Sequence, residues 1–156
     1  CFCIMKKLLA IIVLCLLWGS IGFAKIDAEK IKTIKCELDS IEKGGEKLDE
    51  EAMKKQWYEE GGPKVEKFII KKNRIKSKMF DFKNLFIKDN IITGNNYTKA
   101  KTADEDEFII FEAKMSILID LYEMSALVKE QYIFSDDESV EEEPLISFSY
   151  LNCIAK

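Results

Sequence analysis

The stretch MSILIDLYEMSALVKEQYIF (Met115 to Phe134) has the pattern of two strands joined by a tight turn. In its first half, three apolar residues beginning with Ile117 fall on one face of a strand, and Ser116 and Asp120 fall on the other. In its second half, Tyr132 and Phe134 fall on the same face of the strand. Period-two alternation of this kind is typical of half-buried strands. The stretch therefore predicts an antiparallel hairpin that turns at the Glu-Met-Ser segment.

Similar short runs recur on both sides of this hairpin. The segments interpreted as strands are 31–38, 65–71, 75–82, 85–88, 90–93, 107–114, 115–122, 126–134 and 145–154. Residues 94–106 lack an apolar rhythm and predict an exposed loop, and residues 135–144 predict an acidic connection. Roughly eight short strands without alternating helices indicate a mainly β protein, either a small antiparallel β-barrel or a β-sandwich meander.

The segment 108–134 also permits a different interpretation. Residues 112–130 contain good helix formers as well as β-branched residues, so one long helix is the main alternative. The continuous apolarity from Phe108 to Phe111 instead suits a central strand that is covered on both faces. We take the strand interpretation.

One segment predicts a short amphipathic helix near residues 46–60. It is rich in helix formers, has acidic residues early, and ends at the Gly-Gly-Pro sequence of residues 61–63. Leu48, Met53 and Trp57 can share one helical face. We expect Trp57 to anchor this helix on the sheet; an exposed aromatic contact for a partner is the alternative.

Two cysteines flank the strand-rich region, Cys36 near its start and Cys153 near its end. An oxidising compartment favours their pairing, so we predict a Cys36 to Cys153 disulfide. Such a bridge requires the first and last strands to be neighbours, as in a meander that closes. Two buried free thiols are the alternative.

The N-terminal residues have the order of a secretory signal peptide. A Met-Lys-Lys start at Met5 precedes an apolar run, and Gly22 and Ala24 supply the small residues that a signal peptidase needs. We expect residues 1–24 to comprise upstream residues and a signal peptide cleaved after Ala24, and residues 25–156 to form a single exported β-rich domain. An uncleaved membrane anchor is the alternative.

Composition excludes several function classes. The chain has no histidine, which removes histidine-based nucleophile systems and histidine metal sites. Its formal net charge of −4 argues against nucleic acid as a partner. Lysine greatly outnumbers arginine, which suggests a bacterial, AT-rich genome. No catalytic, cofactor-binding or metal-binding residue is predicted, and we expect the protein not to be an enzyme.

Two kinds of charged segment could bind something. The acidic stretches 104–107 and 136–143 could hold calcium, but their spacing does not match a calcium loop, and we interpret them as solvated. A basic strip could contact an anionic surface, although outward-facing lysines on a solvated sheet explain it equally well. The strip consists of Lys67, Lys71, Lys72, Arg74, Lys76 and Lys78.

The signal segment, a cysteine near each end and the strand meander together resemble the layout of small exported proteins of Gram-negative bacteria. The outline is also similar to that of periplasmic lysozyme inhibitors, which are small disulfide-pinned barrels. The resemblance implies a periplasmic or secreted location and transfers no functional residue.

The expected function is a non-enzymatic periplasmic binding or accessory domain with an unknown ligand or an envelope protein as partner. We expect the protein to contact a membrane only through an uncleaved signal segment. The alternatives are a membrane-tethered envelope structural protein, an inhibitor, or a carboxylate-based hydrolase.

Overall fold

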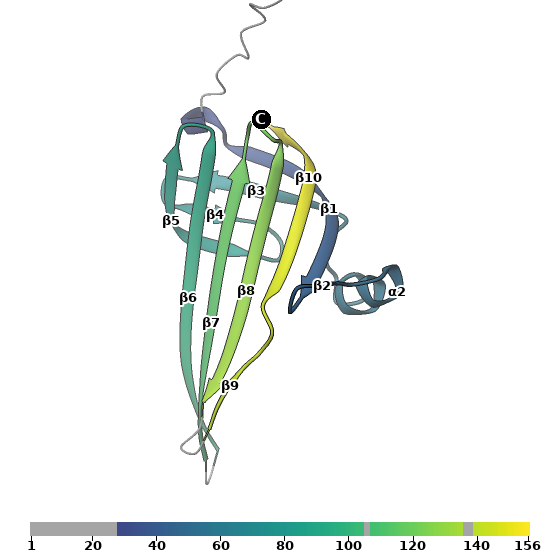
Figure 1. The fold of residues 1–156 in the computed structure, drawn as a ribbon. Coiled ribbons are helices and arrows are strands. Elements are labelled where there is room, and N and C mark those ends of the chain that lie inside the picture. Colours follow the sequence, from purple (N-terminus) through teal and green to yellow (C-terminus); the bar gives the residue numbers. More distant parts are fainter. Residues whose placement is uncertain (1–27, 105–106, 136–138) are drawn as a thin grey trace, which may run out of the picture.

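The chain forms a closed antiparallel barrel of eight strands in the computed structural model, which describes residues 28–104, 107–135 and 139–156 (Figure 1). Around the ring the strands are β1 (Thr33–Lys43), β3 (Val65–Lys71), β4 (Arg74–Lys76), β5 (Asp81–Lys88), β6 (Ile91–Asp104), β7 (Glu107–Asp120), β8 (Ser125–Ser135) and β10 (Ile146–Ala155). Pairing of β10 with both β1 and β8 closes the ring. The sequence left barrel and sandwich open, and the structure is a barrel. The predicted signal segment, residues 1–24, lies outside the described residues.

Two further short strands pair with the ring without belonging to it. Strand β2 (Glu46–Lys47) pairs with β1, and β9 (Val140–Glu142) pairs with β8. The acidic connection predicted for residues 135–144 therefore contains a strand. A 3-10 turn, η1 (Ala28–Lys30), precedes β1.

The core fills the barrel interior because side chains point alternately inward and outward along much of the strands. In β1, for example, buried and exposed residues alternate from Ile34 to Ser40. Phe68 and Tyr150 are fully buried and meet edge to face, with ring centroids 5.6 Å apart. Phe82 is also fully buried, so aromatic rings occupy much of the centre.

The predicted disulfide is confirmed. Cys36 in β1 and Cys153 in β10 lie on neighbouring strands; their Cα atoms are 4.1 Å apart, and the two residues are 117 positions apart in sequence. The pairing of β1 with β10 shifts register between Lys35 and Glu37, at the position of Cys36. The bond staples the first and last strands of the barrel, and it is compatible with an oxidising, extracellular compartment.

The predicted helix is present but shorter, because residues 46–47 pair with β1 instead. It comprises α2 (Glu50–Met53) and a following π-helical turn, η2 (Lys54–Tyr58). The side chain of Asp49 caps its start by accepting a hydrogen bond of 2.8 Å from the Ala52 N–H. Trp57 is buried in the core, as predicted for an anchor. Within the described ranges, no helix has the length and apolarity needed to cross a membrane.

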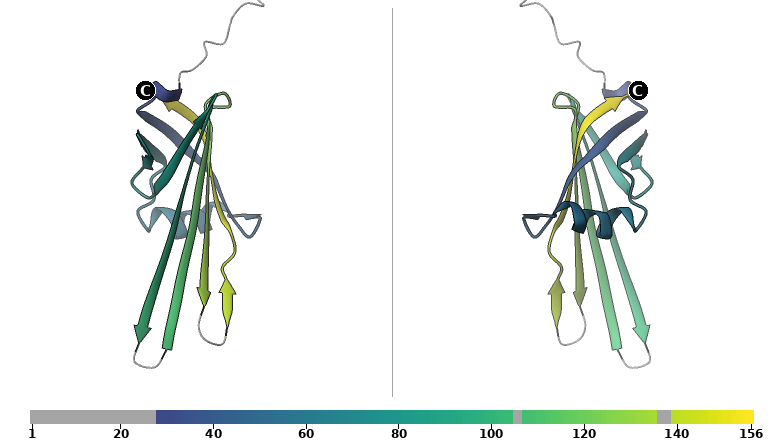
Figure 2. Two further views of the ribbon diagram at one scale, coloured as in Figure 1. Left: turned by 90° about the vertical axis from the view of Figure 1, so that its left-hand side faces the viewer. Right: turned by 90° about the vertical axis from the view of Figure 1, so that its right-hand side faces the viewer.

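The exposed loop predicted for residues 94–106 is wrong. Strands β6 and β7 stay in register from Ile91 with Asp120 to Asp104 with Glu107. Figures 1 and 2 show this hairpin running well beyond the short strands β3 to β5 as a long ribbon. The polar residues 95–104 need no buried face, since backbone pairing with β7 and cross-strand contacts hold this part of the hairpin. One such contact joins Lys99 Nζ to Glu112 Oε1 at 2.7 Å.

Two other expectations about strands need correction. The strand predicted for residues 75–82 is split, because a turn at residues 77–80 separates β4 from β5. The Ser77 side chain holds this turn by accepting a 2.9 Å hydrogen bond from the Phe80 N–H, and Phe80 points into the core.

Residues 107–114 are not covered on both faces: Ile110 and Phe111 are only half-buried. The alternative of a helix across residues 108–134 is excluded by β7 and β8.

Candidate functional site

A pocket of about 340 Å³ lies where the helix meets the inner faces of β8 and β10, and we call it the mouth pocket. Figure 1 shows the helix next to β1 and β2, and Figure 2 shows it below the level of the short strands. The apolar residues that line the mouth pocket are Ile41, Leu48, Trp57, Met79, Phe80, Ile146 and Phe148. The polar lining residues are Gln56, Glu60, Glu130 and Tyr132. Open barrel ends are common places for small-molecule sites, and the volume lies near the lower end of the roughly 300–1,000 Å³ that such sites span.

Three aromatic rings form one wall of the mouth pocket. The Trp57 and Phe148 ring centroids are 4.9 Å apart, and Phe80 lies 5.4 Å from Phe148 and 6.1 Å from Trp57. The Trp57 indole N–H donates a 3.1 Å hydrogen bond to the Pro63 carbonyl, which fixes the ring. Each ring comes from a different element, so the helix, the 77–80 turn and β10 together build the wall.

A carboxyl and a phenol form the polar side of the mouth pocket. The Tyr132 hydroxyl donates a 3.1 Å hydrogen bond to Glu130 Oε2, and both residues lie on the inward face of β8. Burial raises the pKa of the Glu130 carboxyl, and the hydrogen bond from Tyr132 opposes that rise. Burial and the neighbouring Glu130 raise the pKa of Tyr132 to about 12.

A second polar group lies deeper in the barrel. Glu66 and Tyr150 are both fully buried. Glu66 Oε1 accepts a 3.0 Å hydrogen bond from the Lys78 N–H. Within the part of the chain that the structure describes, Glu66 Oε2 and the Tyr150 hydroxyl have no hydrogen-bond partner. Burial, Glu66 and Glu130, in that order, raise the pKa of Tyr150 above its ordinary range. The polar atoms of the interior are thus acidic or neutral.

These interior acids were missed from sequence, although the alternation that predicted the strands also marks them. Glu66 shares a face with Phe68, two positions along β3. Glu130 shares a face with Val128 and Tyr132 in β8. An acidic residue in the apolar register of a strand is the signal that could have found both.

The residues that the sequence singled out lie elsewhere. The disulfide is next to one interior acid, since Cys36 pairs with Glu66 across β1 and β3. All six residues of the basic strip are exposed, as expected for a solvated face. Of the acidic stretches, residues 105–106 and 136–138 lie outside the described residues. Elsewhere in the described chain, acidic and cysteine side chains form no group of three that could hold a metal ion.

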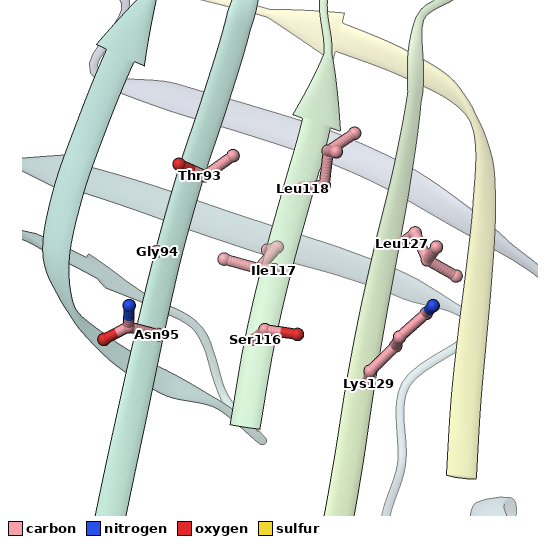
Figure 3. Close-up of a pocket in the computed structure, with 8 residues that line it drawn as sticks. All are labelled: Thr93, Gly94, Asn95, Ser116, Ile117, Leu118, Leu127 and Lys129. Atoms are coloured by element: carbon pink, nitrogen blue, oxygen red, sulfur yellow. The ribbon is translucent and has the colours of Figure 1, made fainter. Parts of the chain in front are cut away.

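A second depression, of about 320 Å³, lies on the outer face of β6, β7 and β8. Figure 3 shows its side chains on three adjacent strands around Gly94. Leu118, which is 43% exposed, forms part of its floor with its cross-strand neighbour Leu127, and Lys129 is its one charged lining residue. It offers less enclosure and less chemistry than the mouth pocket, which we therefore take as the candidate site.

The tyrosines of the interior give a testable pH dependence. An ordinary tyrosine ionises near pH 10. Because the folded protein raises the pKa of Tyr132 and Tyr150, the folded chain holds protons that the unfolded chain loses. The free energy of unfolding should therefore fall as the pH rises from 10 towards 12.

Absorbance at 295 nm measures this ionisation directly. We expect increases in absorbance above pH 10 that come from these two tyrosines. Tyr132→Phe should remove one of the increases, and Tyr150→Phe should remove the other. Ionisation of all five tyrosines near pH 10 in the folded chain would contradict the burial described here.

Comparison of the chain with protein-family models, with curated proteins and with solved structures found no match. The fold and the site therefore define a class by geometry alone. It is a disulfide-closed, eight-stranded antiparallel barrel with an aromatic pocket at one end.

Proposed function

We propose that the protein is a non-enzymatic binding domain whose ligand is a small, largely apolar molecule held in the mouth pocket. The observation that carries the proposal is the pocket itself, in which three aromatic side chains from three elements surround one side of a space of about 340 Å³. Apolar walls with a few converging polar groups are the usual composition of a small-molecule site. The volume favours one ring with a short substituent.

The domain acts outside the cytoplasm in this proposal, in the bacterial periplasm or as a secreted protein. The order of residues in the 1–24 segment supports export. The buried disulfide supports an oxidising compartment, since such bonds persist there. Lysine-rich composition supports the bacterial origin.

The test is ligand-dependent thermal stabilisation by 2-phenylethanol, an uncharged ring with a short polar tail. A ligand that binds only the folded state raises the melting temperature in a saturable way. We expect a saturable rise for the full chain. Ile146→Phe, which adds bulk to the pocket lining, should abolish it.

Leu151→Phe is the matched control, because it enlarges an exposed residue of the same strand, outside the pocket. It should leave the rise unchanged. If Ile146→Phe and Leu151→Phe respond alike, or if the unaltered chain shows no saturable rise, the proposal is wrong.

A further inference from the structure

We propose that the mouth pocket selects a cationic ligand, a small organic ammonium whose apolar body lies against the aromatic wall and whose charge is directed at the Glu130 carboxyl. This inference rests on the proposed function and names its ligand class. It follows from the charges of the lining, from the aromatic rings on one side of the pocket, and from Glu130 having no cationic partner among the residues that the structure describes.

The charges of the lining have one sign. The pocket contains two carboxyl groups, Glu60 and Glu130, and none of its lining residues is lysine or arginine. Among the described residues, no lysine or arginine forms an ion pair with Glu130. An anionic ligand would meet only like charge here, whereas a cation would find complementary charge.

Glu130 is half-buried, which makes its carboxyl unlike that of a surface acid. A buried carboxylate without a cationic partner is unfavourable, and this cost is why its pKa is raised. Its neighbour Tyr132 donates one hydrogen bond and leaves other lone pairs of the carboxylate free. An ammonium group can fill these with charge-assisted hydrogen bonds, the stronger kind.

The aromatic wall suits the same ligand. Trp57, Phe80 and Phe148 line the pocket together with Glu130, and their ring centroids lie 4.9–6.1 Å apart. The negative faces of aromatic rings attract organic cations, and tryptophan does so best. A ligand with an ammonium group and a short apolar body would therefore gain from both sides of the pocket.

The test compares three ligands with the same ring and different charge: phenethylamine, 2-phenylethanol and phenylacetate. The protein is the full chain with Trp18→Phe, so that Trp57 is its one remaining tryptophan and its emission reports on the pocket. We expect phenethylamine to bind roughly tenfold more tightly than 2-phenylethanol, as a charge-assisted hydrogen bond implies. Phenylacetate should bind most weakly.

Glu130→Gln keeps the shape of the side chain and removes its charge. We expect it to weaken phenethylamine roughly tenfold and to change 2-phenylethanol by less than about twofold. Glu60→Gln is the matched control: it removes the charge of an exposed residue that also lines the pocket, and should change the affinity for phenethylamine by about twofold or less.

The outcomes separate the two proposals. Equal affinities for the three ligands, or tightest binding of phenylacetate, would overturn the cationic preference and leave the pocket as a binding site. An unchanged charge preference in Glu130→Gln would overturn the role of Glu130. If none of the three ligands alters Trp57 emission, both the preference and the proposed function fail. The comparison of ligands on the unmutated Glu130 decides the question even if Glu130→Gln does not fold.

Discussion

Replacing Cys36 and Cys153 together by alanine should lower the free energy of unfolding by about 4–5 kcal/mol, the value that the chain-entropy account gives for a loop of this length. The bond joins residues 117 positions apart and so restricts nearly the whole unfolded barrel. Its location between β1 and β10 also joins the first and last strands, which have no short connection. This is the largest single effect that we expect in the molecule.

Urea unfolding measures this effect. The measurement compares the protein that keeps Cys36 and Cys153 with the alanine double variant. The chain has three other cysteines, Cys1, Cys3 and Cys15, and serine at these positions in both proteins prevents disulfide exchange. A reducing agent should lower the stability of the protein that retains the pair and leave the alanine double variant unchanged. Equal unfolding midpoints for the two proteins without reductant would contradict the account.

Gly62→Ala should destabilise the protein by about 1–3 kcal/mol through overpacking. A Cβ atom at position 62 would overlap the indole ring of Trp57, and the Gly62 N–H donates a 2.8 Å hydrogen bond to the Trp57 carbonyl. The ring must therefore move, and one wall of the mouth pocket moves with it. In the Trp18→Phe background, Trp57 emission should shift to longer wavelength as the ring becomes exposed.

Gly61→Ala is the control for this variant. Gly61 has a positive φ of 87° and open space around its Cα, so alanine there costs backbone strain but contacts no ring. It should leave Trp57 emission unchanged. An unshifted emission in Gly62→Ala, together with unchanged stability, would show that the close packing of Gly62 on Trp57 is absent in solution.

The parts of the fold that sequence predicted are those where one face of a strand is buried. In β1 and at the start of β8 the burial of every second residue imposes alternation, and alternation is visible in sequence. The Cys36 to Cys153 pairing was predicted on different grounds, from two cysteines flanking the strand-rich region in a chain expected to be exported. Trp57 was recognised as an anchor since its helical spacing from Met53 marks one face.

The parts that sequence did not predict are held by pairing and not by burial. Residues 95–104 form a strand because β7 is their partner across the whole length, and neither face needs apolar residues. The turn that divides β4 from β5 depends on a side-chain hydrogen bond of Ser77, a contact with no periodic signature.

The candidate site was less predictable than the fold. Its residues come from the helix, from the 77–80 turn and from β8 and β10, and only ring closure brings these elements together. Glu66 and Glu130 were treated as two acids among 28, although each occupies the inward register of its strand. An acidic residue at an inward-facing position of a strand indicates an interior acid from sequence alone. It does not indicate the pocket, which forms between separate elements.

The most direct test of the account is a map of amide and indole chemical-shift changes when phenethylamine is added to the isotopically labelled full chain. The account predicts that the largest changes fall on Trp57, Phe80, Glu130 and Phe148, which surround the mouth pocket. Changes centred instead on the outer depression around Gly94, or scattered over the surface, would contradict it.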